Sequence, residues 1–276
     1  MTRPTDQLDD FRRSHAPRWL RHRDHDWEYI AQGNGEVLLL LHGGGGTAAA
    51  FFAYFPALAP SFRLIAPSLP DSVTTSDDAI AGIAAILDAE GIAAAHVLGH
   101  SQGGYLAIAL SHRLPERLRT LTLVCTALPS PGQSRYVARL LRCLDRTPDL
   151  LLRPVMRLAM RRAGKLCGSA LTAEESRLLL SFAPFADRAR LRRWARSSAL
   201  LQLDYHDHEQ DDRRWSGRVL LIEAGRDRIF SAAEAAALRT RYPQATVARF
   251  EGAGHLDPII RAAPFLTALQ SFLAAR

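Results

Sequence analysis

Long apolar runs, lysine and cysteine are all scarce in this 276-residue sequence. No apolar stretch approaches the roughly 18 residues that suggest a membrane-spanning helix. Residues 1–23 are charged and contain no apolar core of a signal peptide. The three cysteines (Cys125, Cys143 and Cys167) are an odd and scattered set. We therefore expect no membrane partner, no disulfide framework and a reducing, cytoplasmic location.

Lysine is nearly absent, because Lys165 is the only one, so arginine carries the net charge of +7. Residues 128–218 hold 17 arginines and one lysine against ten acidic residues, a charge of +8, which leaves the rest of the chain at −1. Few aromatic residues interleave these arginines, and no nucleic-acid-binding motif occurs. We interpret them as a solvated face and predict no nucleic-acid partner. A further hypothesis is that Arg135 and Arg139 attract an anionic substrate.

The sequence does contain a regular alternation of strand-like and helix-like segments from residue 37 to residue 125. The run at 37–41 is continuously apolar, which is typical of a strand covered on both faces. The alternation predicts an α/β fold with a doubly wound, mostly parallel sheet. Strands are expected at 37–41, 62–66, 93–98 and 118–125, and helices at 47–58, 77–89 and 102–114.

Two regions depart from this alternation. Residues 1–16 are polar and are expected to form a loosely held arm before two short strands at 18–22 and 27–30. After residue 128 no strand pattern occurs until residue 218, and apolar and arginine residues recur at helical spacing. We predict an all-helical lid inserted after the sixth strand. The predicted core is 1–127 and 213–276, the cap is 128–212, and the last elements are strands at 218–224 and 245–250 and helices at 231–242 and 258–275.

The most informative motif is Gly99-His100-Ser101-Gln102-Gly103, which lies between an apolar run and a helix-like run. In this context Gly-x-Ser-x-Gly is typical of a sharp strand-to-helix turn that exposes a serine hydroxyl. Glycine at both positions avoids Cβ atoms where backbone segments pass closely. The N-terminus of the following helix would favour negative charge that develops beside the serine. Ser101 is therefore the candidate nucleophile.

A serine nucleophile needs a base, and the base needs a group that orients it. Of the ten histidines, His255 follows the last apolar strand on a loop of small residues. Open α/β sheets carry their sites at the carboxyl ends of their strands. Asp227 follows the preceding strand, whereas its competitor Glu223 lies within the strand end. We predict His255 as the base and Asp227 as its acidic partner.

Acyl transfer also needs hydrogen-bond donors for an oxyanion. The glycines at 43–46 follow a buried strand, and glycine lets backbone N–H groups approach a substrate oxygen. We predict the amides of Gly44 and Gln102 as the oxyanion hole, with Gly43 and Gly45 as neighbours. A phosphate-binding loop is excluded, because no Gly-Lys-Ser/Thr follows these glycines.

The cluster His206-Asp207-His208-Glu209 could suggest a metal site. Its spacing matches no strong metal motif, and the charged residues that follow indicate a solvated junction. The acyl-transfer chemistry needs neither a metal nor an organic cofactor, and we predict none.

On these residues the chain resembles the α/β-hydrolase family from about residue 18 to its end. The features that carry the resemblance are the His42-Gly43-Gly44 turn, the elbow at 99–103, Asp227 and His255. Serine, aspartate and histidine follow one another in the family's order, and the family also places its cap after the sixth strand. The resemblance implies a nucleophile, a base, an orienting acid and an oxyanion hole formed respectively by Ser101, His255, Asp227, and the Gly44 and Gln102 amides.

The serine argues against the dehalogenases and epoxide hydrolases of this family, which use an aspartate at the elbow. We predict a carboxylesterase-like serine hydrolase that cleaves a carboxylic ester, lactone or thioester of a small to medium, partly apolar substrate. The alternatives are a C–C bond hydrolase, an acyltransferase or a perhydrolase with the same residues, or a non-catalytic ligand-binding member of the fold. Both a monomer and a homodimer stay open.

Overall fold

An eight-stranded sheet organises the protein in the computed structural model, which describes residues 3–128, 130–208 and 215–275. The strand order is β1-β2-β4-β3-β5-β6-β7-β8. The β1–β2 and β2–β4 pairs are antiparallel and the other five pairs are parallel, which confirms the predicted mostly parallel sheet. The strands are β1 (Arg18–His22), β2 (His25–Gln32), β3 (Glu36–Leu41), β4 (Phe62–Ser68), β5 (Ala95–His100), β6 (Leu118–Val124), β7 (Arg218–Ala224) and β8 (Thr246–Phe250).

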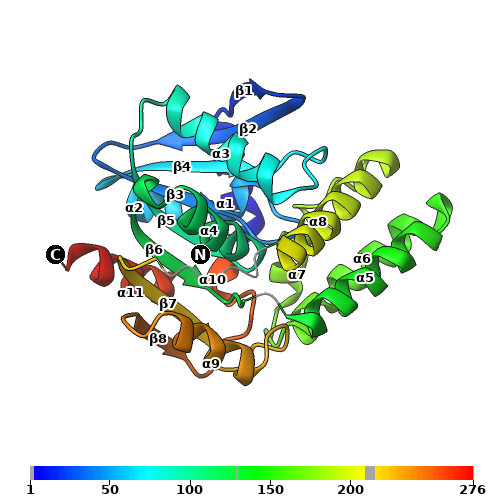
Figure 1. The fold of residues 1–276 in the computed structure, drawn as a ribbon. Coiled ribbons are helices and arrows are strands. Elements are labelled where there is room, and N and C mark those ends of the chain that lie inside the picture. Colours follow the sequence, from blue (N-terminus) through cyan, green and yellow to red (C-terminus); the bar gives the residue numbers. More distant parts are fainter. Residues whose placement is uncertain (1–2, 129, 209–214, 276) are drawn as a thin grey trace.

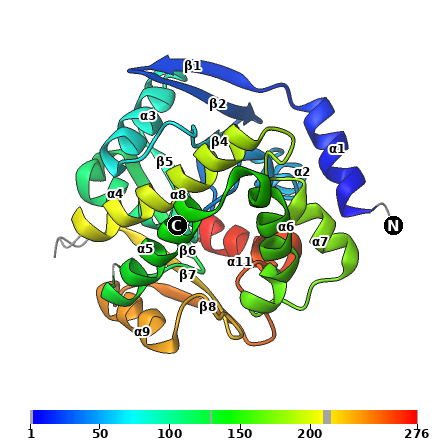
Figure 2. The same ribbon diagram turned by 90° about the vertical axis from the view of Figure 1, so that its right-hand side faces the viewer.

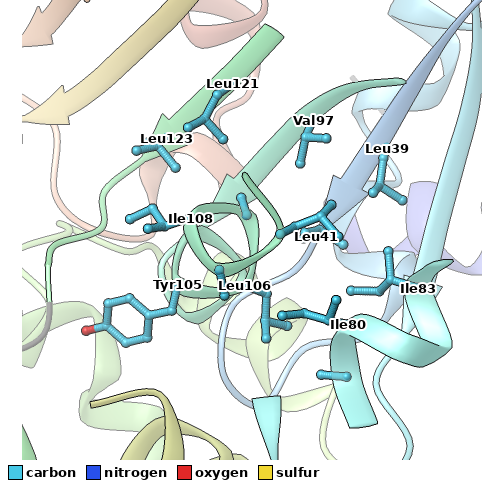
Figure 3. Packing of buried hydrophobic residues seen from close by; sticks show 14 of the residues in the cluster. Leu39, Leu41, Ile80, Ile83, Val97, Tyr105, Leu106, Ile108, Leu121 and Leu123 are labelled. Carbon is cyan, nitrogen blue, oxygen red and sulfur yellow. The ribbon is translucent and has the colours of Figure 1, made fainter. Parts of the chain in front are cut away.

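Helices cover both faces of the sheet, and each face has its own buried apolar cluster. Successive side chains of a strand point to opposite faces, so Leu39 and Leu41 of β3 join one cluster and Leu38 and Leu40 join the other. Figure 3 shows Leu39 and Leu41 packed among side chains of β5 and two helices. The core helices are α1 (Pro4–Ser14), η1 (Ala48–Phe51), α2 (Tyr54–Leu58), α3 (Ser76–Ala89), α4 (Gln102–Arg113), η2 (Pro115–Arg117), α9 (Ala232–Arg241), α10 (Asp257–Ile260) and α11 (Ala263–Ala274).

Three local expectations are wrong. The expected arm at 1–16 contains the helix α1, which buries Leu8 and Phe11 in one of the apolar clusters. The expected helix at 47–58 is divided into the 3₁₀ helix η1 and the short helix α2. The expected helix at 258–275 is divided into α10 and α11, because a proline near the start of α11 cannot continue the preceding helix.

Four helices connect β6 to β7: α5 (Pro131–Arg146), α6 (Asp149–Leu166), α7 (Ala173–Leu180) and α8 (Arg188–His208). We call residues 130–208 the helical segment. In Figures 1 and 2 its helices lie at one end of the sheet, and α8 lies between the core and the helices α5 and α6. The predicted boundary between residues 212 and 213 lies outside the described residues. Within the described ranges, no helix combines the length and apolar character that crossing a membrane requires.

Candidate active site

The turn between β5 and α4 holds Ser101 in an unusual backbone conformation, with φ 53° and ψ −117°. Such a conformation is costly for a residue with a side chain and is typical of functional sites. A Cβ atom at Gly99 would lie 2.2 Å from the carbonyl oxygen of Gly103. A Cβ atom at Gly103 would lie 2.1 Å from the carbonyl oxygen of Leu41. Both glycines are therefore required by close backbone approach, and the turn presents the serine at the carboxyl end of β5.

The structure brings Ser101, His255 and Asp227 together. His255 Nε2 lies 2.9 Å from Ser101 Oγ, and His255 Nδ1 lies 2.8 Å from Asp227 Oδ2. Because a carboxylate only accepts hydrogen bonds, Nδ1 carries the proton and Nε2 offers its lone pair to the serine hydroxyl. These residues follow β5, β8 and β7, so all three lie at the carboxyl edge of the sheet. This arrangement can remove a proton from the serine as it attacks.

Asp227 is itself held in place by backbone amides. Its Oδ1 accepts hydrogen bonds from the N–H groups of Ile229 (2.7 Å) and Phe230 (3.2 Å). The competing carboxylate, Glu223, instead binds Arg239 at 2.6 Å. The second oxygen of Asp227 therefore stays directed at His255.

A buried histidine, His100, contacts the backbone of His255. His100 Nε2 donates a hydrogen bond to the carbonyl oxygen of His255 at 3.0 Å. Burial, together with the neighbouring His255, lowers the pKa of His100 to about 3. His100 is therefore neutral near neutral pH, and its role is to hold the backbone of the base.

Cys125 lies beside the acid and the base, and one ligand atom from each of Cys125, Asp227 and His255 lies within 4.8 Å of the others. Burial raises the pKa of the Cys125 thiol well above its usual value, so the thiol is protonated and a poor metal ligand. The carboxylate and the imidazole already bind each other. These three side chains are therefore better suited to hydrogen bonding than to binding a metal ion. Residues 206–209, for which we predicted no metal site, lie partly outside the described residues.

The glycine loop at 43–46 lies against the serine turn. A Cβ atom at Gly43 would lie 3.3 Å from Ser101 Cβ, and one at Gly44 would lie 3.0 Å from Gln102 Oε1. The amide of Gln102 opens α4, where backbone N–H groups have no acceptor within the helix. The glycine loop and the first turn of α4 therefore both lie next to the serine.

His42 fixes the start of this loop. Its Nδ1 donates a hydrogen bond to the Gly43 carbonyl oxygen at 2.8 Å, and its Nε2 accepts one from the Leu69 amide at 3.0 Å. Burial lowers the pKa of His42 to about 4. The neutral ring can therefore donate and accept at the same time.

Helix α8 of the helical segment contacts both the serine turn and the glycine loop. Gln102 Nε2 donates to the Ser198 carbonyl oxygen at 2.7 Å, and Ser198 Oγ donates to Gln102 Oε1 at 3.0 Å. A Cβ atom at Gly45, which has φ 71°, would lie 2.9 Å from the Trp194 ring. Sequence reasoning missed Trp194 and Ser198, because their four-residue spacing on a helix carries no motif.

Residues 167–170, which we call the strap, join α6 to α7 and contact the loops of both the acid and the base. The His255 amide donates to the Cys167 carbonyl oxygen at 2.9 Å. A Cβ atom at Gly168, which has φ 76°, would lie 1.7 Å from the carbonyl oxygen of Arg226. A Cβ atom at Gly254 would lie 2.3 Å from the carbonyl carbon of Gly168. The strap therefore fits against residues adjacent to Asp227 and His255 only because glycines face one another there.

The structure combines a mostly parallel sheet, helices on both faces, and a hydrogen-bonded serine, histidine and aspartate at the carboxyl ends of strands, where open α/β sheets carry their sites. The sequence model of the alpha/beta hydrolase family matches residues 38–268, and the chain belongs to this family.

One curated relative matches most of the chain. The chain is 29% identical over 265 residues to the dihydrolipoyllysine-residue acetyltransferase component of the acetoin cleaving system of Cupriavidus necator. That match covers 89% of this chain and 66% of the relative, so the chain spans slightly less than two thirds of its length.

Two solved esterase structures share the fold. The esterase from Exiguobacterium antarcticum has a TM-score of 0.79 and 13% identity over 94% of this chain and 100% of that chain. A thermophilic esterase from Thermogutta terrifontis has a TM-score of 0.71 and 20% identity over 94% of this chain and 98% of that chain. At these identities the two structures establish the fold alone.

Proposed function

We propose that this protein is a serine hydrolase that cleaves a carboxylic ester, lactone or thioester of a small to medium, partly apolar substrate. The observation that carries the proposal is the hydrogen-bonded series from Asp227 through His255 to Ser101. It is combined with a strained turn that exposes the serine. The match of residues 38–268 to the alpha/beta hydrolase family model supports the same class of reaction.

The reaction proceeds in two steps. Ser101 Oγ attacks the substrate carbonyl while His255 Nε2 takes the serine proton, and Asp227 stabilises the resulting imidazolium. The oxyanion accepts hydrogen bonds from the amides of Gly44 and Gln102. The imidazolium then protonates the leaving alcohol or thiol, which leaves an acyl-enzyme on Ser101. Water, deprotonated by His255, then attacks this ester; His255 returns the proton to Ser101 Oγ as the acid is released.

We assign the helical segment as the cap over this site. Trp194 and Ser198 of α8 lie against the glycine loop and Gln102, respectively, so the cap bounds the space beside the serine. The substrate is a small molecule with an apolar part that packs beneath these helices.

A second candidate is acyl transfer to an alcohol in place of water, since one relative is named an acetyltransferase component. The same acyl-enzyme would form, but its acceptor would differ. Product analysis with and without an alcohol acceptor separates the two reactions. An ester product that dominates over the free acid would identify a transferase.

The decisive experiment measures a p-nitrophenyl ester series together with labelling by a fluorophosphonate probe. We expect the wild-type protein to hydrolyse short to medium esters and to be labelled at Ser101. Ser101→Ala should abolish labelling and reduce kcat by at least about 10⁴-fold. Ser14→Ala, which changes an exposed serine on α1, should leave both unchanged. Undiminished turnover or labelling in Ser101→Ala would refute the proposal.

A further inference from the structure

Exposed apolar side chains are concentrated on two helices of the cap. Eight large apolar side chains are exposed in the described part of the chain, and six of them lie on α5 and α6. Single exposed apolar residues are ordinary, whereas a group of them marks a surface that binds something. The six are Tyr136, Leu140, Leu150, Leu151, Val155 and Leu158, with exposed fractions between 48% and 70%.

The same two helices carry a large excess of positive charge. They contain eight arginines and one lysine but only two acidic residues. Both carboxylates are engaged by α8, Asp149 with Arg192 at 2.6 Å and Asp145 with Arg196 at 3.6 Å. Seven exposed basic side chains form no ion pair within residues 3–128, 130–208 and 215–275: Arg135, Arg139, Arg142, Arg146, Arg161, Arg162 and Lys165.

Apolar and basic residues occupy adjacent stripes on each helix. Each residue of an α-helix advances by about 100°, so residues three and four apart share a face. On α5, Tyr136 and Leu140 form one stripe, and the row of arginines beginning at Arg135 lies beside it. On α6, Leu151, Val155 and Leu158 form a stripe, which Arg162 and Lys165 continue toward the end of the helix, and Arg161 lies beside it. We call these combined stripes the α5–α6 surface.

The α5–α6 surface lies on the outside of the molecule. Figures 1 and 2 show both helices farthest from the sheet, with α8 behind them. The turn that joins them brings Leu150, which is 70% exposed, close to the end of α5. The most exposed apolar side chain therefore lies at the tip of a projecting pair of helices.

We propose that the α5–α6 surface binds the anionic headgroup layer of a lipid membrane. Amphipathic helices with arginine beside an apolar stripe lie in the plane of such an interface, with the apolar side chains below the headgroups and the cations on the phosphates. Arginine suits this role because its guanidinium binds phosphate through two parallel hydrogen bonds. We predicted no membrane partner because the sequence contains no long apolar run, and binding of this kind needs no such run.

Charge argues against the other occupants. Two copies of the α5–α6 surface would place unpaired arginines of one protomer opposite those of the other, which is unfavourable. Single-stranded nucleic acid needs aromatic side chains on which bases stack, and Tyr136 is the sole aromatic residue of the two helices. A lipid surface supplies both negative charge and apolar depth.

The proposal is tested by sedimentation of the full chain with lipid vesicles. One set of vesicles contains phosphatidylcholine alone, and the other contains phosphatidylcholine with phosphatidylglycerol. We expect binding to the anionic vesicles that weakens as sodium chloride is added, and little binding to the neutral vesicles. Equal binding to both sets, or binding to neither, would overturn the proposal.

Variants separate the apolar contribution from the charge. Leu150→Ser with Leu151→Ser, and separately Arg139→Glu with Arg142→Glu, should each weaken binding to anionic vesicles about tenfold or more. Arg139→Lys with Arg142→Lys keeps the charge and should retain most of the binding. Trp19→Ser removes an exposed aromatic side chain (63% exposed) from β1 and is the apolar control that should change nothing.

Two further measurements make the outcome unambiguous. Turnover of a short, uncharged, water-soluble ester and the circular dichroism spectrum should match the wild type in every variant, which shows that the fold is intact. Analytical ultracentrifugation tests whether a second copy of the chain binds to the α5–α6 surface instead. If the leucine variant converts a dimer to a monomer while anionic vesicles bind wild type and variant equally, the surface joins two copies of the chain and the lipid proposal is wrong.

Discussion

The sheet core and the helical segment bury their residues very differently. All six residues of β5 are buried, because helices cover both faces of the sheet. In α5, Val137 is the one buried residue among sixteen, because this helix packs on α8 and faces solvent elsewhere. The core therefore has little freedom to shift, whereas the helical segment is held along fewer contacts.

This difference divides the proposed active site into two parts: the reacting groups, which belong to the core, and their neighbours, which belong to the helical segment. The proposed nucleophile, base and acid follow strands of the buried sheet, which fixes their separation. The helical segment supplies neighbours of the site through Ser198, Trp194 and the strap. Changes to the core groups should therefore alter the chemical step most, and changes to the helical segment should alter it less.

The largest effect expected in the core comes from Asp227→Asn. The amide would no longer stabilise the imidazolium and would favour the wrong tautomer of His255, so we expect kcat to fall about 10⁴-fold. The matched control is Glu223→Gln, which changes a carboxylate near the end of β7, the strand that Asp227 follows; this carboxylate binds Arg239. Steady-state kinetics on one ester compare the two variants. Equal losses would mean that the acid has been assigned to the wrong residue.

Much of the core could be predicted because its physical causes are local. A strand covered on both faces must be apolar along its length, and the run at 37–41 shows this directly. The turn at Ser101 needs glycine at fixed positions, so its motif is readable. The proximity of Asp227 and His255 could be predicted because the carboxyl ends of parallel strands meet at one edge.

The remaining features depend on partners that are distant in the sequence. Leu8 and Phe11 stabilise the helix α1 by packing into an apolar cluster of the core. This cluster is formed by distant parts of the chain, so the sequence of residues 1–16 alone suggested a loose arm. The strap binds His255 through the carbonyl oxygen of Cys167, a group that every residue carries. Trp194 lies against Gly45 because of the way α8 is oriented about its own axis, and the spacing of residues in the sequence does not specify this orientation.

The second prediction concerns stability of the core in acid. Burial lowers the pKa of His42 to about 4, and burial with the neighbouring His255 lowers that of His100 to about 3, whereas an unfolded histidine titrates near 6.5. Below that value the unfolded chain binds more protons than the folded chain, so stability decreases as pH decreases. Between about pH 7 and about pH 5 each histidine should remove about 2 kcal/mol from the free energy of unfolding.

Urea unfolding at the two pH values measures this dependence. His42→Asn loses part of the wild-type hydrogen bonding and should be less stable at neutral pH. It should nevertheless show a shallower decrease in acid, because one titrating group is absent. His100→Asn should behave in the same way. A decrease as steep as that of the wild type in both variants would show that neither histidine is responsible.

The smallest effect expected, and the one that tests the boundary between the two regions, comes from glycines at the strap. Gly254→Ala places a Cβ atom 2.3 Å from the backbone of Gly168, so the loop of His255 and the strap must separate. A displacement of about 1 Å can cost about 10²-fold in rate, and we expect kcat to fall by about 10- to 100-fold with a smaller change in KM. Gly168→Ala, whose Cβ atom would collide with the Arg226 carbonyl oxygen, should have a similar effect.

Gly252→Ala is the matched control, since it changes the same loop but adds a Cβ atom with nothing within 4 Å. If the strap positions the base, Gly254→Ala and Gly168→Ala lose turnover whereas Gly252→Ala keeps it. The melting temperatures of the three variants should differ little, so that the loss of turnover does not come from unfolding. If all three variants keep full turnover, the strap has no influence on His255. The core alone would then determine the rate, because a contact that can be broken without loss of turnover cannot be what holds the base in place.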